Sequence, residues 1–379
     1  MLTFTFATAG RISFGAGAAA HLVPTVAELG ARPFICTGSN PDRFAGLLDG
    51  LPGASRFAVS GEPSFDVVRA GAAAARKLGA DVVVGLGGGA VLDAAKAIAA
   101  LVTNGGDPLD YAEVIGGGHP LTVRSLPCVA VPTTSGTGSE VTANAVVSSL
   151  EHQVKVSLRS ASMLPTVALV DPELTVGCPP DVTAHAGLDA LVQCIEPFVS
   201  SFATPLTDGF AREGIRRAGS GLRRAWADGS DLDARTDVSL CSLLSGLALA
   251  NSKLGAAHGL AGPLGGLLGA PHGAITAAVM VAVSRANVAA LTDQDPDHPA
   301  LRRYAEVGEL LTGEATAEAG LAWFAETAQL MGIKGLASLG LRDDQVPGIA
   351  LAASQASSTK GNPVRLPVER LEAVIRASL

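Results

Sequence analysis

The 379-residue sequence has little charge, few aromatic side chains and no cluster of lysine and arginine. Charged residues make up 16%, aromatic residues make up 4%, and the formal net charge is -8. Nucleic acids and anionic membranes attract proteins through basic patches, so we expect neither of them as a partner. A small molecule is the expected substrate class.

The sequence also lacks long apolar runs and paired cysteines. No stretch reaches the roughly 18 uninterrupted apolar residues of a membrane span, and the opening MLTFTFATAGR lacks the basic and apolar regions of a signal peptide. The cysteines are odd in number and stand in apolar stretches, which is typical of reduced, buried thiols. They are Cys36, Cys128, Cys178, Cys194 and Cys241. These features predict a cytoplasmic protein.

Length and apolar content indicate a globular chain of two domains. Hydrophobic residues make up 48% of the sequence, which is typical of a globular protein. A chain of 379 residues is longer than one that usually folds around a single hydrophobic core. We expect two domains that share a ligand-binding cleft. Residues 1–175 are predicted to form an α/β domain with a doubly wound, mostly parallel sheet, and residues 176–379 an all-helical domain.

Local patterns support this division. Residues 64–78 have apolar side chains at helical spacing behind the N-cap Ser64. A buried strand, a glycine turn and another helix follow, which is the βαβ order of a doubly wound sheet. The expected strands cover residues 3–15 around Gly10, 32–38, 81–86, 129–132 and 167–171. The expected helices cover residues 187–196, 208–227, 239–251, 272–289, 301–311, 315–331 and 368–377.

Two loops after neighbouring predicted strands are candidates for nucleotide binding. Residues 87–96 (GGGAVLDAAK) lie between a strand and a helix, where bare N–H groups and the helix dipole can hold a pyrophosphate. The spacing is not GxGxxG, and a tight turn is the alternative interpretation. Residues 132–142 (PTTSGTGSEVT) offer six hydroxyls and two glycines, and Thr137 or Ser139 can cap a helix there. Together the loops mark a cleft.

Four further residues form a candidate metal site. Asp189 and Gln193 are four residues apart in a predicted helix, so they face the same side. His258 follows later, and His272 stands directly after Pro271 at a predicted helix start. Either histidine by itself is more often a helix cap or a hydrogen-bonded core residue.

The two loops resemble the GGGSxxDxAK and PTTxGTGSE signatures of the iron-containing (group III) alcohol dehydrogenases, a family that includes the maleylacetate reductase branch. The similarity extends along the whole chain to residues 361–367 (GNPVRLP). It implies that family's architecture, a dinucleotide-binding domain followed by a helical domain. The implied function is NAD(P)-dependent hydride transfer between nicotinamide and a small alcohol or aldehyde, carried out by a homodimer.

The resemblance also implies roles for individual residues. Those expected along the dinucleotide are Gly87, Gly88, Gly89, Asp93, Thr133, Thr134, Thr137 and Ser139, with Lys155 nearby as a catalytic residue. Ala90 replaces the usual serine, which removes one hydroxyl but leaves the backbone N–H groups of the loop available to the phosphates. Gly38 stands where the family often has an acidic residue that binds the ribose 2′-hydroxyl. Without that carboxylate a 2′-phosphate is not repelled, so NADP(H) is expected to bind at least as well as NAD(H).

The metal ligands of the family are an aspartate and a histidine on one helix and two further histidines fourteen residues apart. Asp189, His258 and His272 match this set and are expected to bind Fe²⁺ or Zn²⁺ and to be catalytic. Gln193 replaces the second ligand, and an amide oxygen is a poorer donor than an imidazole. Gly262 replaces a further histidine beside the nicotinamide. In the alternative interpretation the metal site is degenerate and these side chains only form hydrogen bonds.

Two other functions remain open. The stretch 4–17 resembles the maleylacetate reductases, which reduce an enoyl dicarboxylate, although Gly262 counts against that branch. The third hypothesis is a fold redirected to non-redox chemistry, as a lyase, a cyclase or a ligand-binding protein. Both departures from the family pattern lie at the chemical centre, which is what redirected chemistry predicts.

Overall fold

The computed structural model describes residues 3–51, 53–149, 151–152 and 154–379, and the chain forms two compact units. Ala7–Thr134 and Gly138–Val176 make up an α/β unit. Gly177–Leu379 make up a helical unit, together with residues 3–6 and the segment Ser135–Thr137. The hydroxyl-rich loop therefore contributes residues to both units.

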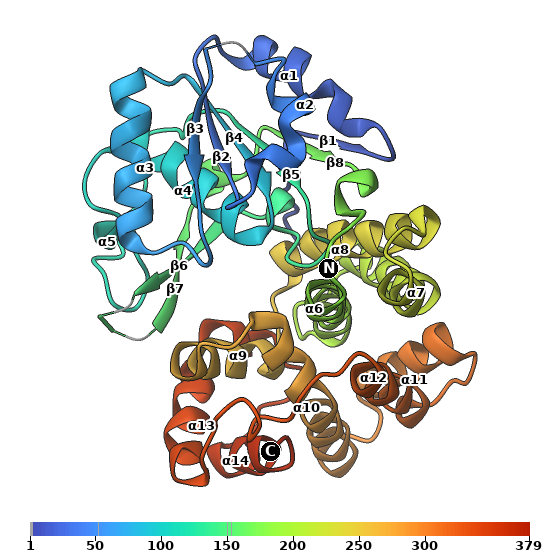
Figure 1. Ribbon diagram of the computed structural model, residues 1–379. Helices are drawn as coiled ribbons and strands as arrows, with labels where there is room; N and C mark the ends of the chain where they lie inside the picture. Colours follow the sequence, from blue (N-terminus) through green and yellow to red (C-terminus); the bar gives the residue numbers. More distant parts are fainter. Residues whose placement is uncertain (1–2, 52, 150, 153) are drawn as a thin grey trace. The chain divides into compact units, whose positions relative to one another are not determined.

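A six-stranded parallel sheet forms the centre of the α/β unit (Figure 1), with the strand order β1-β8-β5-β4-β2-β3. The strands are Arg11–Phe14 (β1), Pro33–Thr37 (β2), Ser55–Ala58 (β3), Val82–Gly87 (β4), Cys128–Pro132 (β5) and Val167–Val170 (β8). The order reverses between β2 and β4. The carboxyl ends of these two strands are thus the switch point at which α/β sheets bind ligands.

Helices cover both faces of this sheet. Val82 and Val84 of β4 pack in one apolar cluster with α1 (Leu22–Leu29), and Val83 packs on the opposite face with α3 and α4. α3 (Phe65–Leu78) begins behind Ser64, whose hydroxyl accepts from the Val67 N–H, so the predicted cap is confirmed. α4 spans Gly89–Asn104. Burial on both faces explains why the central strands are nearly continuous apolar runs.

Two features of the α/β unit differ from the sequence-based expectation. Residues 3–9 were expected to be strands, but the first strand starts at Arg11, because only from there does the chain pair with β8. An antiparallel hairpin of β6 (Asn144–Ser149) and β7 (Val154–Arg159) was not predicted, nor was β3. The alternation in VKVSLR, which buries Val156 and Leu158, was the available signal for β7.

The remaining short elements of the α/β unit are η1 (Ala18–His21), η2 (Pro41–Phe44), α2 (Ala45–Leu48), α5 (Pro108–Tyr111), η3 (Ser139–Val141), η4 (Ala161–Met163) and η5 (Pro172–Thr175).

The helical unit is built around one extensive apolar core, and each predicted helix is present in it. Its elements are α6 (Pro180–Val199), α7 (Pro205–Ala227), α8 (Leu232–Ser252), α9 (Ala256–Leu268), α10 (His272–Gln294), α11 (Pro299–Thr312), α12 (Ala317–Leu330), η6 (Asp343–Gln345), α13 (Val346–Gln355), η7 (Ser357–Gly361) and α14 (Val368–Arg376). α9 was not predicted, because Pro263 inside it would by local rules end a helix. All five cysteines are free and buried, as predicted.

Among the described residues, α10 has the length and composition of a membrane span, and α8 with α9 meets the same criteria only as a pair bent by 101°. In α10, 67% of the most apolar window is buried inside the structure. Ile275, Val279 and Val283 belong to the core of the helical unit. Packing against neighbouring helices therefore accounts for the apolar character of α10.

Candidate functional site

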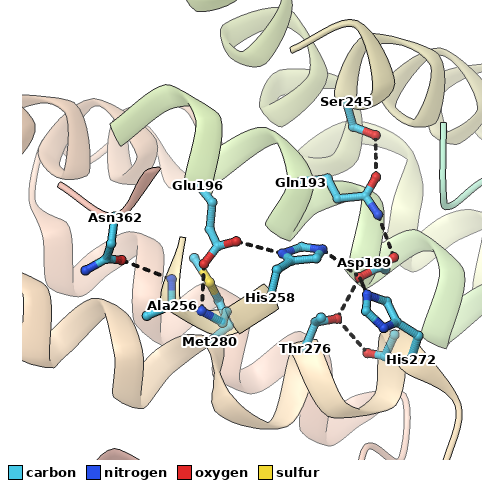
Figure 2. Close-up of polar contacts among 12 residues, drawn as sticks. Asp189, Gln193, Glu196, Ser245, Ala256, His258, His272, Thr276, Met280 and Asn362 are labelled. Atoms are coloured by element: carbon cyan, nitrogen blue, oxygen red, sulfur yellow. Dashed lines mark hydrogen bonds and ion pairs between the residues drawn. The ribbon is translucent and has the colours of Figure 1, made fainter. Parts of the chain in front are cut away.

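Helix α6 carries a carboxylate whose two oxygens are both held in place. Asp189 is only 3% exposed. Its Oδ2 accepts a hydrogen bond from Nε2 of Gln193 at 2.6 Å, and its Oδ1 accepts from the Thr276 hydroxyl at 2.7 Å (Figure 2). Because α6 and α10 both contribute donors, the orientation of Asp189 is fixed by two helices.

His258 and His272 bring ring nitrogens to this carboxylate. His258 lies in the first turn of α9 and is buried, and His272 is the first residue of α10, with 36% of its side chain exposed. Their Nε2 atoms lie 3.5 Å and 4.0 Å from Oδ1 of Asp189. One ligand atom of each of the three residues lies within 4.8 Å of the others. Three helices thus assemble a cluster of two imidazoles and one carboxylate.

Gln193 lies beside this cluster but directs its amide nitrogen toward it. Its Oε1 accepts a hydrogen bond from the Ser245 hydroxyl at 3.0 Å, while its Nε2 faces Asp189. An amide oxygen placed 2.6 Å from a carboxylate oxygen would be repelled, which favours the observed orientation. To serve as the predicted fourth ligand, the amide has to turn over, and that role stays a prediction.

Electrostatics couple the carboxylate and the histidines. Burial by itself raises the pKa of Asp189, but the charge of His272 and the proximity of His258 and Thr276 hold it below its ordinary value. Burial opposes the protonation of His258, but the carboxylates of Glu196 and Asp189 prevail and raise its pKa to about 10. A divalent cation at Nε2 takes the place of that proton.

Glu196 is a residue of this site that the sequence analysis missed. It is 3% exposed, and its Oε2 lies 2.6 Å from Nδ1 of His258. Its other oxygen accepts from the Ala257 N–H at 2.7 Å. The available signal was its position on α6, seven residues and about two turns after Asp189, on the same side of the helix.

The glycine loop joins the buried strand β4 to the N-terminus of α4, as predicted. Gly88 is the N-cap of α4, and no side chain caps the helix there. A Cβ on Gly88 would lie 3.2 Å from Oγ1 of Thr134, whereas a Cβ on Gly87 would lie 2.6 Å from Cγ2 of Val91. Gly87 is therefore needed for packing within the turn, while Gly88 leaves helix N–H groups accessible to an anion.

The ends of neighbouring strands carry three of the predicted nucleotide-binding residues of the α/β unit, Gly38, Gly87 and Thr133. Gly87 is in register with Pro132, and the Thr133 N–H donates to the Gly87 carbonyl at 2.9 Å. Gly38 follows β2, the neighbour of β4 on its other side. A Cβ on Gly38 meets no atom within 4 Å. The carboxyl edge at the switch point is thus formed largely by small residues and hydroxyls.

Asp93 and Ser139 contact each other rather than an open surface. The Ser139 hydroxyl donates to Oδ1 of Asp93, and the Val146 N–H donates to Oδ2 at 2.9 Å. The buried Lys96 pairs with Asp93 at 3.1 Å and donates to the Ser139 carbonyl at 2.9 Å. Thr137 or Ser139 was expected to cap a helix, but Gly138 is the N-cap of η3 and no side chain caps it. This cluster orders the hydroxyl-rich loop, and direct contact with a dinucleotide stays a prediction.

The remaining predicted residues are Thr137 and Lys155. Thr137 belongs to the segment that packs with the helical unit, whereas Ser139 belongs to the α/β unit. Lys155 is on β7, where its ammonium group pairs with Glu62 at 3.2 Å. Their places near the cofactor stay predictions.

Comparisons with known proteins agree with this architecture along nearly the whole chain. Residues 9–172 match the family model of the iron-containing alcohol dehydrogenases, and residues 183–379 match the Fe-containing alcohol dehydrogenase C-terminal model. The chain is 36% identical over 326 residues to 4-hydroxybutyrate dehydrogenase of Cupriavidus necator, covering 85% of this chain and 84% of the relative. It is 33% identical over 327 residues to NAD-dependent methanol dehydrogenase of Bacillus methanolicus, covering 84% and 82%.

Solved structures give the same result. A 1,3-propanediol oxidoreductase superposes with a TM-score of 0.91 at 31% identity, covering 100% of both chains. Sulfoacetaldehyde reductase from Bifidobacterium kashiwanohense in complex with NAD⁺ gives 0.88 at 27% identity, covering 100% of this chain and 99% of the other. The chain therefore belongs to the iron-containing alcohol dehydrogenase family and is an alcohol oxidoreductase.

Proposed function

We propose that this protein interconverts a small alcohol and its aldehyde with a nicotinamide dinucleotide and a divalent metal. The observation that carries the proposal is the cluster of Asp189, His258 and His272. Nε2 of His258 is buried and makes no hydrogen bond among the described residues, although Oδ1 of Asp189 lies 3.5 Å away. Such a nitrogen costs roughly 1–3 kcal/mol unless something binds it, and ligation of a metal is a sufficient reason for it.

The donor set fits a divalent transition metal. Two neutral imidazole nitrogens and one carboxylate suit Fe²⁺ or Zn²⁺ and leave positions for substrate. When bound, the metal supplies Lewis-acid polarisation and the nicotinamide supplies hydride exchange. Asp189, His258 and His272 hold the metal, and Thr276 and Gln193 keep the oxygens of Asp189 in place. The balanced reaction is alcohol plus NAD(P)⁺ to aldehyde, NAD(P)H and a proton.

The α/β unit is proposed to bind the dinucleotide. The uncapped N-terminus of α4 at Gly88 suits the pyrophosphate, and we propose that Thr134, which lies beside Gly88, and its neighbour Thr133 contact the phosphate oxygens. The NAD dependence of the methanol dehydrogenase and the NAD⁺ in the reductase complex support this class of cofactor. Open space at Gly38 accommodates a 2′-phosphate, so NADP(H) is included. We further propose that residues 1–175 and 176–379 are the two domains. We also propose that the protein is a homodimer, which analytical ultracentrifugation will test.

A nicotinamide absorbance assay tests the function. The protein is loaded with Fe²⁺ without oxygen, or with Zn²⁺, and offered NADH or NADPH with short aldehydes, hydroxyaldehydes and an enoyl dicarboxylate. We expect aldehyde reduction that a chelator abolishes and added metal restores. Asp189→Ala should abolish it, whereas Asp293→Asn, an exposed change near the end of α10, should not. Reduction of the enoyl dicarboxylate in place of aldehydes would favour the maleylacetate reductase alternative. Failure with every carbonyl compound would refute the redox function.

A further inference from the structure

Glu196 has its carboxylate held by two neighbouring donors of α9. Nδ1 of His258 lies 2.6 Å from one oxygen, and the Ala257 N–H donates to the other at 2.7 Å. The side chain is 4% exposed, so water does not compete for these contacts. Figure 2 shows Glu196 on one side of the His258 ring and Asp189 on the other.

This arrangement determines which ring nitrogen of His258 faces the metal cluster. A metal-bound histidine coordinates through an unprotonated nitrogen while its other N–H donates to a carboxylate or carbonyl. Because Glu196 engages Nδ1, the nitrogen left to face Asp189 is Nε2, a buried atom that makes no hydrogen bond among the described residues and lies 3.5 Å from Oδ1 of Asp189. We propose that Glu196 is a positioning residue of the metal centre, which holds the His258 ring with its Nε2 lone pair toward the metal. The proposal rests on the proposed metal site.

A carboxylate, rather than an amide, is required at residue 196. Both of its oxygens must accept, one from Nδ1–H of His258 and one from the Ala257 N–H. A glutamine has one oxygen and one NH₂ group, so one of the two donors would face another donor. If the NH₂ group faced His258, Nδ1 would become the acceptor, and the ring proton would move to Nε2, where it blocks the metal.

The start of α9 is itself built to hold this carboxylate. The Ala256 N–H donates to Oδ1 of Asn362 at 3.1 Å, and Asn362 donates in turn to Oδ1 of Asn287 at 2.7 Å. A Cβ on Gly255 would lie 2.8 Å from Oε1 of Glu196, so a larger residue there would have to displace the carboxylate. The C-terminal segment 361–367 thus acts through Asn362, which fixes the turn of α9 that carries the two donors.

Cobalt binding provides the test, with Co²⁺ itself as the probe. Glu196→Gln, Glu196→Asp and the control Glu318→Gln, which removes an exposed carboxylate on α12, are compared with the wild type. Co²⁺ affinity is measured by competition with a chelator, and circular dichroism of the metal-free proteins verifies the fold. We expect Glu196→Gln to weaken Co²⁺ binding about 10- to 100-fold, with no change in the control. Glu196→Asp keeps two acceptors and should recover part of the loss.

Proton NMR of the Co²⁺ protein gives a second readout, which a merely structural role would not affect. The wild type should show a shifted, slowly exchanging ring N–H from His258, because Glu196 shields it. In Glu196→Gln this signal should disappear or exchange rapidly.

Wild-type affinity together with an unchanged ring signal in Glu196→Gln would overturn the proposal. If that variant does not fold, absence of the slowly exchanging signal in the wild type overturns it as well. A wild type that binds no Co²⁺ removes both this inference and the proposed metal site, whereas the first two outcomes leave the metal site standing.

Discussion

Gln193 and Asp189 share a hydrogen bond of 2.6 Å in which the amide nitrogen of Gln193 is the donor. The family resemblance implies a metal-binding imidazole where this amide stands. Gln193 orients the carboxylate and offers no lone pair to a metal in this arrangement. The expected consequence is a metal centre that is well ordered but weakly binding.

We therefore predict substoichiometric metal in the purified protein and tighter binding in Gln193→His, because an imidazole completes a four-ligand set. Elemental analysis and Zn²⁺ titration measure both quantities. Gln193→Ala, which removes the amide without adding a ligand, is the control and should not bind more tightly. Absence of metal from both the wild type and Gln193→His, with aldehyde reduction intact, would contradict the metal assignment.

The second prediction concerns Gly88. Valine at this position should weaken the binding of NADH and NADPH at least tenfold, about 1.4 kcal/mol. Its branched side chain would fill the space between the start of α4 and Thr134, where the backbone has to approach a phosphate. Isothermal calorimetry measures the affinity. Gly46→Val, at an open position on α2, is the control. Equal affinity of both folded variants for the dinucleotides would rule out phosphate binding at Gly88.

The third prediction is that Gly38 determines the preference between NADPH and NADH. NADPH should bind no worse than NADH to the wild type, and Gly38→Asp should shift the preference toward NADH more than tenfold. A new side chain fits, because a Cβ at this residue would meet no atom within 4 Å. Gly38→Asn has nearly the same size without the charge, so it separates repulsion of the 2′-phosphate from steric effects. A wide wild-type preference for NADH would count against this prediction.

The fourth prediction is that Glu140 makes the stability of the α/β unit depend on pH. Burial raises the pKa of Glu140 to about 7, although Lys96 opposes the shift. The unfolded carboxyl titrates near pH ~4.3, so between these values the folded state binds the proton more tightly. This stabilisation is fully present below about pH 4, is lost as the pH rises to about 7, and changes no further above that.

Glu140→Gln should abolish this loss and raise the free energy of unfolding at pH 8 by as much as ~3 kcal/mol relative to the wild type. Urea unfolding followed by circular dichroism at pH 5 and pH 8 measures the difference. The exposed change Glu309→Gln is the control. Equal pH dependence in the Glu140→Gln and wild-type proteins would show that Glu140 does not carry this effect.

Local periodicity accounts for what the sequence predicted of the fold. The apolar spacing behind Ser64 predicts α3, and the apolar run from Val82 predicts β4, because each pattern matches the period of its own element. Residues 3–9 have a strand-like pattern but form no strand, because the register with β8 begins only at Arg11 and a strand is stable only within a sheet. Strand pairing is a long-range property that local spacing does not contain.

The site, like the fold, has features that local spacing predicts and features that depend on long-range packing. The sequence by itself placed Asp189 and Gln193 on one face of a helix, since four residues make about one turn, and its glycine loop marked the start of α4. Only the tertiary structure brought His258 and His272 to Asp189, directed the amide nitrogen of Gln193 rather than its oxygen toward the cluster, and joined Glu196 to Nδ1 of His258. The physical reason is that a metal site requires donor atoms within a few ångströms of one point. Helices distant in sequence meet that condition only when their packing fixes both position and hydrogen-bond direction.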